Sequence, residues 1–135
     1  MMILRFLFSA AAFVAATYSL SAYSSPDKII PEPVEYSVSE GFHNLKGDGS
    51  DIKVYLSDAE FASKIKDLPS FAQEEAYRLV VGRKGVRIYA KTEEGAFRAA
   101  QCLEMVRLID RDIQFCDIFD YPRFQHRGIM LDESR

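Results

Sequence analysis

Two runs of alternating residues, joined by a short turn, constrain the fold more than any other part of this sequence. The runs span residues 76–81 (Ala-Tyr-Arg-Leu-Val-Val) and 86–90 (Val-Arg-Ile-Tyr-Ala), and residues 82–85 (Gly-Arg-Lys-Gly) join them. In the second run the apolar residues share one face, and Arg87 and Tyr89 share the other, which is the period of a half-buried strand. Two such runs joined by four residues that include two glycines predict an antiparallel hairpin.

The residues after the hairpin are typical of a long helix. Thr92 is placed to accept a hydrogen bond from the first turn, and Glu93 and Glu94 lie where the helix dipole favours negative charge. Apolar residues then recur at helical spacing: Ala96, Ala99, Ala100, Leu103 and Val106. Because small side chains let a helix approach a sheet closely, we interpret this helix as a packing element.

The remaining elements complete an α+β pattern. Further alternating or apolar runs predict strands at residues 34–38, 41–45, 52–56 and 111–119. Ser57-x-x-Glu60 predicts a capping box that opens another helix, and Pro69 follows the end of that helix. The order is therefore β–β–β–α–β–β–α–β, and we expect a mainly antiparallel sheet with two helices packed on one face. The Pro-rich residues 25–33 are either a linker or a packed edge strand.

The first 24 residues are set aside from the fold, because they are typical of a signal peptide. Arg5 is the only charged side chain before an apolar run at residues 6–18, and Ala22-x-Ser24 fits a small-x-small cleavage rule. The apolar run is shorter than the roughly 20 residues that a spanning helix needs. We therefore expect export to the periplasm or the extracellular space, without stable membrane insertion after cleavage.

Composition excludes several classes of function. The net charge of −3 gives no basic footprint for nucleic acid or an anionic membrane surface. Two cysteines and two histidines, widely separated, form no metal-site pattern. We interpret Cys102 and Cys116 as buried thiols, although export would permit a disulfide and leaves that alternative open.

The last sixteen residues, 120–135, have the pattern of a segment that carries active-site residues. A turn at Asp120-Tyr-Pro leads to an apolar run, Gly128-Ile-Met-Leu131, which is followed by Asp132 and Arg135. A strand with an acid and a base at its carboxyl end is how α/β barrels present active-site residues. A length of 135 residues is enough for one domain but not for such a barrel, which takes about 250.

This stretch also carries a family likeness. Arg127-Gly-x-Met-Leu-Asp132-x-Ser-Arg135 resembles the start of the catalytic barrel in glycoside hydrolase family 20, the β-N-acetylhexosaminidases. The Ile30-Pro-x-Pro33 entry, and the Gly85–Ala90 strand with the Gly95–Gln101 helix after it, resemble that family's non-catalytic N-terminal domain. The resemblance implies three parts: a signal peptide (1–24), the N-terminal α/β domain (25–119), which packs on the barrel, and the start of a truncated (β/α)8 barrel (120–135), whose first strand is 127–131.

The resemblance also implies roles for single residues. Arg135 would bind the hydroxyls of a terminal N-acetylhexosamine, and its planar guanidinium suits this because it can hold two oxygens at once. The family's catalysis uses an Asp–Glu pair further along the barrel: the Glu is the general acid, and the Asp orients the substrate's attacking 2-acetamido group. Neither member lies within residues 1–135, so Asp132 is interpreted as structural, and no metal or organic cofactor is implied.

We therefore expect the N-terminal part of an exported β-N-acetylhexosaminidase that removes terminal non-reducing N-acetylhexosamine from glycans with retention, and we expect residues 1–135 alone to be inactive. Two alternatives remain. One is the N-terminal domain of another glycosidase family, such as a family 84 hexosaminidase or an α-glucuronidase, against which Leu131-Asp-x-Ser-Arg135 argues. The other is an exported, non-catalytic α+β module that binds a glycan or a partner.

Overall fold

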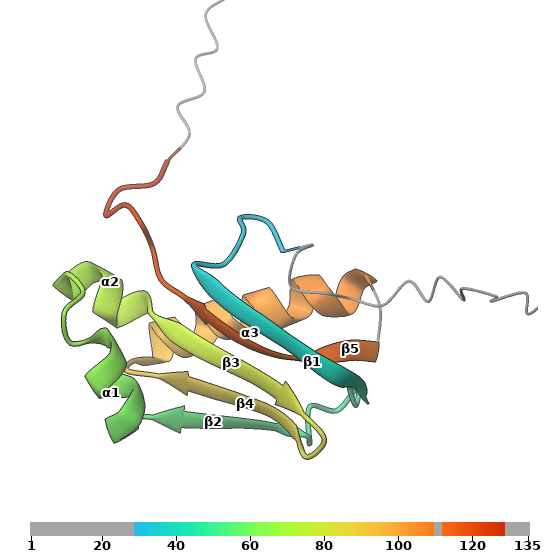
Figure 1. Ribbon diagram of the computed structural model, residues 1–135. Helices are drawn as coiled ribbons and strands as arrows, with labels where there is room; N and C mark the ends of the chain where they lie inside the picture. The colour runs from blue at the N-terminus through green and yellow to red at the C-terminus, as the bar shows by residue number, and fades with distance from the viewer. Residues whose placement is uncertain (1–28, 110–111, 129–135) are drawn as a thin grey trace, which may run out of the picture.

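The structure is a computed structural model that describes residues 29–109 and 112–128 (Figure 1). Five strands and three helices follow one another in these ranges, so the α+β class predicted from the sequence is confirmed. In chain order the elements are β1 (Glu35–Asn44), β2 (Ile52–Leu56), α1 (Ala59–Ile65), α2 (Ser70–Glu75), β3 (Tyr77–Gly82), β4 (Gly85–Ala90), α3 (Glu93–Ile109) and β5 (Asp112–Asp120).

The strands form one mixed sheet in the order β1-β5-β3-β4-β2. The predicted hairpin is present, with β3 and β4 paired antiparallel from Tyr77 opposite Ala90 to Gly82 opposite Gly85. Antiparallel pairs also join β1 to β5 and β5 to β3. The sheet is nevertheless mixed, because β2 lies parallel to β4 at the edge. The chain passes from β2 to β3 through α1 and α2. The next strand, β4, then lies between β3 and β2 in the sheet.

One strand, β1, replaces the two strands expected at residues 34–38 and 41–45. Its pairing with β5 is interrupted by a bulge between Val38 and Phe42. Gly41 lies in this bulge with φ of +113°, and a Cβ there would come within 2.4 Å of the Phe115 ring. The glycine thus marks an irregularity inside one strand rather than the boundary between two.

The first helix begins and ends differently from the expectation. Asp58, not Ser57, is its N-cap, and the Asp58 carboxylate accepts a hydrogen bond of 2.9 Å from the Phe61 N–H. The helix ends at Ile65, and a further helix, α2, which the sequence analysis missed, starts directly after Pro69. Proline has no N–H to donate and a fixed φ, so it is compatible with the start of a new helix as well as with the end of the previous one.

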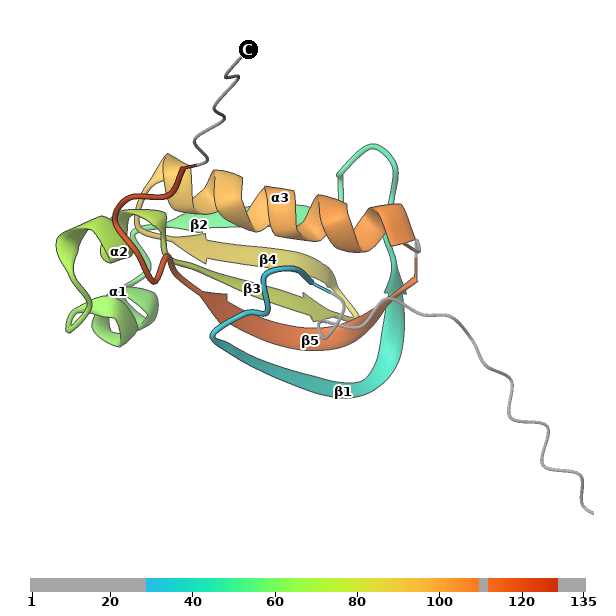
Figure 2. The same ribbon diagram turned by 90° about the horizontal axis from the view of Figure 1, so that it is seen from above.

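Helices lie on both faces of the sheet, which corrects the expectation of two helices on one face. Ile118 packs in a core with Cys102, Leu103 and Val106 of α3. The next residue, Phe119, packs instead with Phe61 and Ile65 of α1, and its ring meets the Phe61 ring edge-on at 6.3 Å. Because successive side chains of a strand point to opposite faces, α1 packs on the face opposite to α3. Figure 2 shows α3 lying along the strands and α1 at one end of the sheet.

The long helix packs as the spacing predicts, with one exception. Ala99, Cys102, Leu103 and Val106 are buried against the sheet, whereas Ala100 is exposed. Cys102 and Cys116 are both buried and free, and burial raises the pKa of the Cys116 thiol to about 12. Such thiols are poor nucleophiles, so both cysteines act as small core residues. In the described residues, no helix has the length and apolar character needed to cross a membrane.

Candidate functional site

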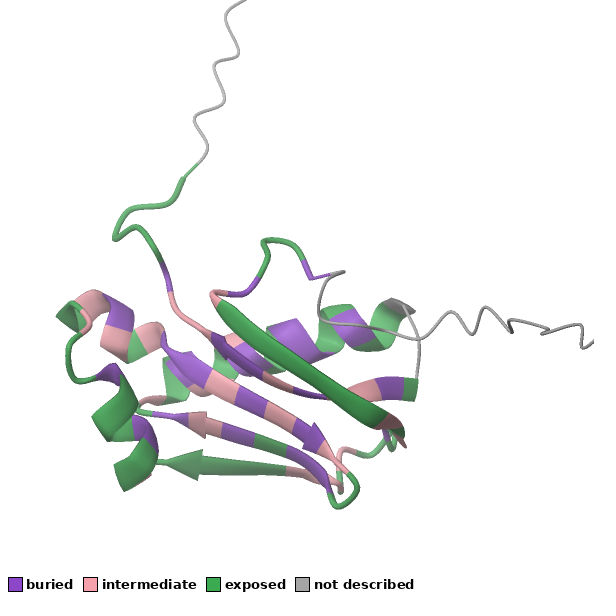
Figure 3. Cartoon of the chain, viewed as in Figure 1, coloured by how far each residue is buried: buried purple, intermediate pink, exposed green. Residues whose placement is uncertain are grey.

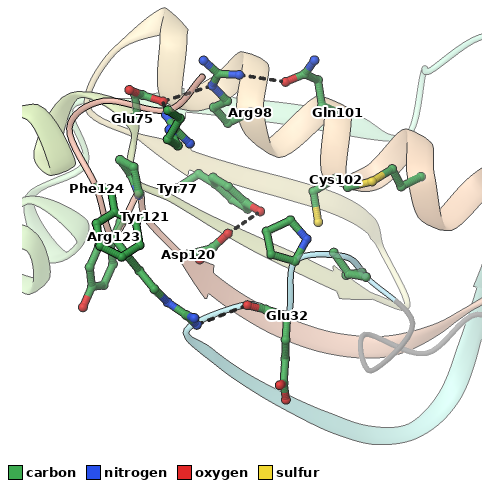
Figure 4. Close-up of a pocket in the computed structure, with 15 residues that line it drawn as sticks. Glu32, Glu75, Tyr77, Arg98, Gln101, Cys102, Asp120, Tyr121, Arg123 and Phe124 are labelled. Atoms are coloured by element: carbon green, nitrogen blue, oxygen red, sulfur yellow. Dashed lines mark hydrogen bonds and ion pairs between the residues drawn. The ribbon is translucent and has the colours of Figure 1, made fainter. Parts of the chain in front are cut away.

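A pocket of about 330 Å³ opens where the two ends of the described chain meet the middle of α3 (Figure 4). One wall comes from residues 29–32, and another comes from residues 121–127, which follow β5. Arg98, Gln101, Cys102 and Met105 of α3 line the third side. The pocket therefore joins segments that enter and leave the domain.

Tyr77 and Asp120 form the polar floor of this pocket (Figure 4). They lie opposite each other in the pairing of β3 with β5, which explains why residues 43 positions apart meet. The Tyr77 hydroxyl donates to Asp120 Oδ2 at 3.4 Å, and the Val34 N–H donates to Asp120 Oδ1 at 3.3 Å. The second bond ties the entering segment to the end of β5.

Burial dominates the electrostatics of the floor. It raises the pKa of the Asp120 carboxyl, and the hydrogen bonds from Val34 and Tyr77 only partly oppose that change. Burial, followed by the neighbouring Cys102 and Asp120, raises the pKa of the Tyr77 hydroxyl well above its usual value. Tyr77 therefore stays protonated and remains a donor to Asp120.

Ion pairs between Glu75 and two arginines form part of the rim of the pocket. Glu75 is the last residue of α2, and its Oε2 atom lies 2.5 Å from an Arg127 terminal nitrogen and 3.2 Å from Arg98 Nε. A terminal nitrogen of Arg98 also pairs with Glu94 one helical turn earlier, at 2.8 Å. Further along the rim, Arg123 donates to the Glu32 carbonyl at 3.3 Å.

The pocket suits an amphipathic group, because apolar walls surround a hydrogen-bonding floor. Ile29, Pro31, Met105 and Phe124 supply apolar wall surface, and Asp120 supplies acceptor oxygens below them. Within residues 29–109 and 112–128, no three His, Cys, Asp or Glu side chains are grouped so that they could hold a metal ion.

The residues predicted to bind substrate lie outside the described part of the chain. This holds for Arg135, for Asp132 and for most of the expected barrel strand at 127–131, and it holds equally for the expected signal peptide. Of the expected barrel start, the structure describes residues 120–128, where Arg127 pairs with Glu75. Tyr77, Glu75 and Arg98 were not predicted from the sequence, because no local motif links them and only the strand register and helix packing bring them together.

Comparisons with known proteins agree with this fold. Residues 46–107 match the family model described as glycosyl hydrolase family 20, domain 2. The chain is 39% identical over 72 residues to β-hexosaminidase A of Caenorhabditis briggsae, and 32% identical over 77 residues to β-hexosaminidase subunit beta of Mus musculus. These matches cover 50% and 54% of this chain but only 13% and 14% of the relatives.

Solved structures share the architecture. A crystal structure of a β-N-acetylhexosaminidase superposes with a TM-score of 0.52 at 22% identity, over 78% of this chain and 19% of that one. An exo-β-N-acetylglucosaminidase of family 20 from Vibrio harveyi gives 0.51 at 18% identity, over 80% and 21%. At these identities the likeness concerns the fold alone. Together with the match over residues 46–107, it leads to one conclusion: this part of the chain is similar to domain 2 of glycosyl hydrolase family 20 and lies in a fold that these solved structures share.

Proposed function

We propose that this chain is the N-terminal part of an exported β-N-acetylhexosaminidase. The complete enzyme removes terminal non-reducing N-acetylhexosamine residues from glycans by substrate-assisted, retaining catalysis. The observation that carries the proposal is the family 20 domain at residues 46–107, followed in the same chain by the motif Leu131-Asp-x-Ser-Arg135. Residues 1–24 act as the signal peptide, and the enzyme works in the periplasm or outside the cell.

Within this proposal the described domain is a support for the catalytic barrel. Arg135 binds the hydroxyls of the terminal sugar, and the barrel beyond it supplies the general acid and the acetamido-orienting Asp. Asp132 has a structural role.

The outer face of α3 supports docking of the barrel on this domain. Phe97 and Leu108 are 54% and 79% exposed, and eleven residues of helix place them about 20° apart, at 100° per residue. Ala99, Leu103 and Val106 are buried on the opposite side of the helix, so Phe97 and Leu108 point away from the sheet. Apolar side chains gathered on an outward helix face are typical of an interface. After β5, the chain crosses to the α3 side of the sheet (Figure 2).

The sheet surface on both sides of α3 is also exposed to solvent. Five strands at about 4.8 Å spacing span about 19 Å, whereas one helix covers about 10 Å. On one flank Val54 and Leu56 of β2 are 52% and 47% exposed, and their partners Ile88 and Ala90 are buried. On the other flank β1 is exposed along most of its length (Figure 3). A second layer on the α3 side, the barrel, would cover these surfaces.

Leu108→Ser tests the docking surface without disturbing the core of the domain. In the 135-residue chain we expect the free energy of unfolding to change by less than about 0.5 kcal/mol, because the side chain is already exposed. In the complete enzyme we expect a loss of about 1–2 kcal/mol, because the leucine is then buried. Denaturant unfolding of both proteins, each with and without the substitution, measures the difference. An equal change in both would contradict docking through α3.

Hydrolysis of a chromogenic N-acetylglucosaminide tests the function itself. The complete enzyme of this proposal should hydrolyse it and release the sugar first as the β-anomer, which NMR detects. Residues 1–135 should stay at background, because they lack the Asp–Glu pair that the family likeness implies. Cleavage by residues 1–135 alone, or none by the longer protein, would contradict the proposal.

A further inference from the structure

We infer that Glu75, Arg98 and Arg127 form an ion-pair cluster, the Glu75 clamp, which holds the chain where it leaves the domain and thereby positions Arg135 for sugar binding. The inference deepens the proposed function, because it rests on the role of Arg135 stated there. Arg127 and Glu75 are positioning residues, since they act through the segment they hold and not on the sugar.

The geometry of the clamp joins three separate segments through one carboxylate. Glu75 comes from the end of α2, Arg98 from the first half of α3, and Arg127 from the segment after β5. Both guanidinium groups approach the same oxygen, Oε2, at 2.5 Å for Arg127 and 3.2 Å for Arg98. The Glu75 side chain is 22% exposed, whereas the Arg98 and Arg127 side chains are 39% and 49% exposed, so solvent screens these pairs in part.

Charge balance favours a fixed arrangement over a transient one. Arg98 is held from its other side by Glu94 at 2.8 Å, so two arginines and two glutamates alternate in one network. Surface ion pairs contribute more to stability when several charges form a network than when they are isolated. Arg98 therefore orients Glu75, and Glu75 is in place for Arg127.

The exit segment depends on side chains for its placement. Residues 121–128 form neither helix nor strand, so no backbone ladder holds them. Arg127 is the last residue of this segment for which the structure gives a side-chain partner, and it stands at the start of the proposed barrel strand. Arg135 follows only eight residues later. A slip of the proposed strand by one residue would shift the strand end that leads to Arg135 by about 3.3 Å.

Kinetics of the complete enzyme test the positioning role. If Arg135 binds the sugar equally in the ground state and the transition state, then a looser Arg135 raises KM and leaves kcat nearly unchanged. We expect Glu75→Gln and Arg127→Gln each to raise KM by about five-fold. Arg127→Lys, which keeps the ion pair, should restore most of the loss. Glu74→Gln is the matched control, because it removes the same charge one residue earlier. Equal KM values for Glu75→Gln and Glu74→Gln would overturn the inference.

A measurement without substrate tests the clamp independently. In the 135-residue chain, we expect the heteronuclear 15N NOE of residues 126–128 to be close to that of β5 and to fall in Glu75→Gln and Arg127→Gln but not in Glu74→Gln. Unchanged NOE values in all three variants would overturn the clamp. If the complete enzyme cleaves no N-acetylhexosaminide, the proposed function fails, and the NOE measurement still decides whether the clamp exists.

Discussion

Gly95→Ala should destabilise the domain by about 2–3 kcal/mol, although the same change in an open helix would stabilise it by about 1 kcal/mol. Gly95 lies in the first turn of α3, where its N–H donates to the Thr92 hydroxyl at 3.3 Å. A Cβ at this position would come within 2.5 Å of the Ala76 carbonyl oxygen and 3.2 Å of the Ala90 Cβ. Because one of these atoms is backbone, relief requires α3 to move away from the sheet.

Denaturant unfolding of the 135-residue chain measures this effect. Gly82→Ala is the control, because a Cβ at Gly82 meets nothing within 4 Å, and we expect it to change the unfolding free energy by less than about 0.5 kcal/mol. A Gly95→Ala protein as stable as the unchanged chain would show that α3 does not approach the sheet this closely. The close approach matters for function, since α3 carries the proposed docking face and Arg98.

Arg135→Gln should lower kcat/KM of the complete enzyme by about 100-fold. Two charge-assisted hydrogen bonds to sugar hydroxyls contribute about 1.5 kcal/mol each, and about 1.4 kcal/mol corresponds to a factor of ten. Glutamine has the wrong geometry and no charge, so both bonds weaken. Arg135→Lys keeps the charge but loses the planar fork, and we expect an intermediate loss.

Steady-state kinetics with a chromogenic N-acetylglucosaminide measure the Arg135 effect. Glu133→Gln is a suitable control, because it changes one charge two residues away without touching the proposed fork. A thermal unfolding midpoint equal to that of the unchanged enzyme would show that Arg135→Gln still folds. A kcat/KM within two-fold of the unchanged enzyme would contradict sugar binding by Arg135.

The elements that were predicted correctly are those specified by residues close together in the sequence. The hairpin at residues 76–90 was predicted correctly, because its alternation and its two turn glycines encode pairing between neighbours in sequence. The spacing of Ala99, Leu103 and Val106 predicted the buried face of α3. The motif at residues 127–135 and the helix 95–101 suggested the family, and the match over residues 46–107 supports that assignment.

Non-local contacts account for the predictions that were wrong. Gly41 resembled a break between strands, but its missing side chain makes room for the Phe115 ring from a neighbouring strand. Ser57 fits a capping motif, yet Asp58 is the cap, and Ser57 takes a φ of 62° while its N–H donates to the Ala90 carbonyl of β4 at 3.1 Å. The stripe of α1 is apolar whichever face of the sheet it covers, and only its contact with Phe119 shows which face that is.

The sequence by itself determined the α+β class, the β3–β4 hairpin and the inward face of α3, because each depends on residues close together in the chain. Only the tertiary structure decided the parallel edge strand β2, the placement of helices on both faces, and the pocket where Tyr77 meets Asp120. Pairings between distant segments depend on which apolar surfaces are left to cover after the local elements form. The Glu75 clamp is of the same kind, since its three residues share no motif and meet only because α2, α3 and the exit segment pack at one end of the sheet.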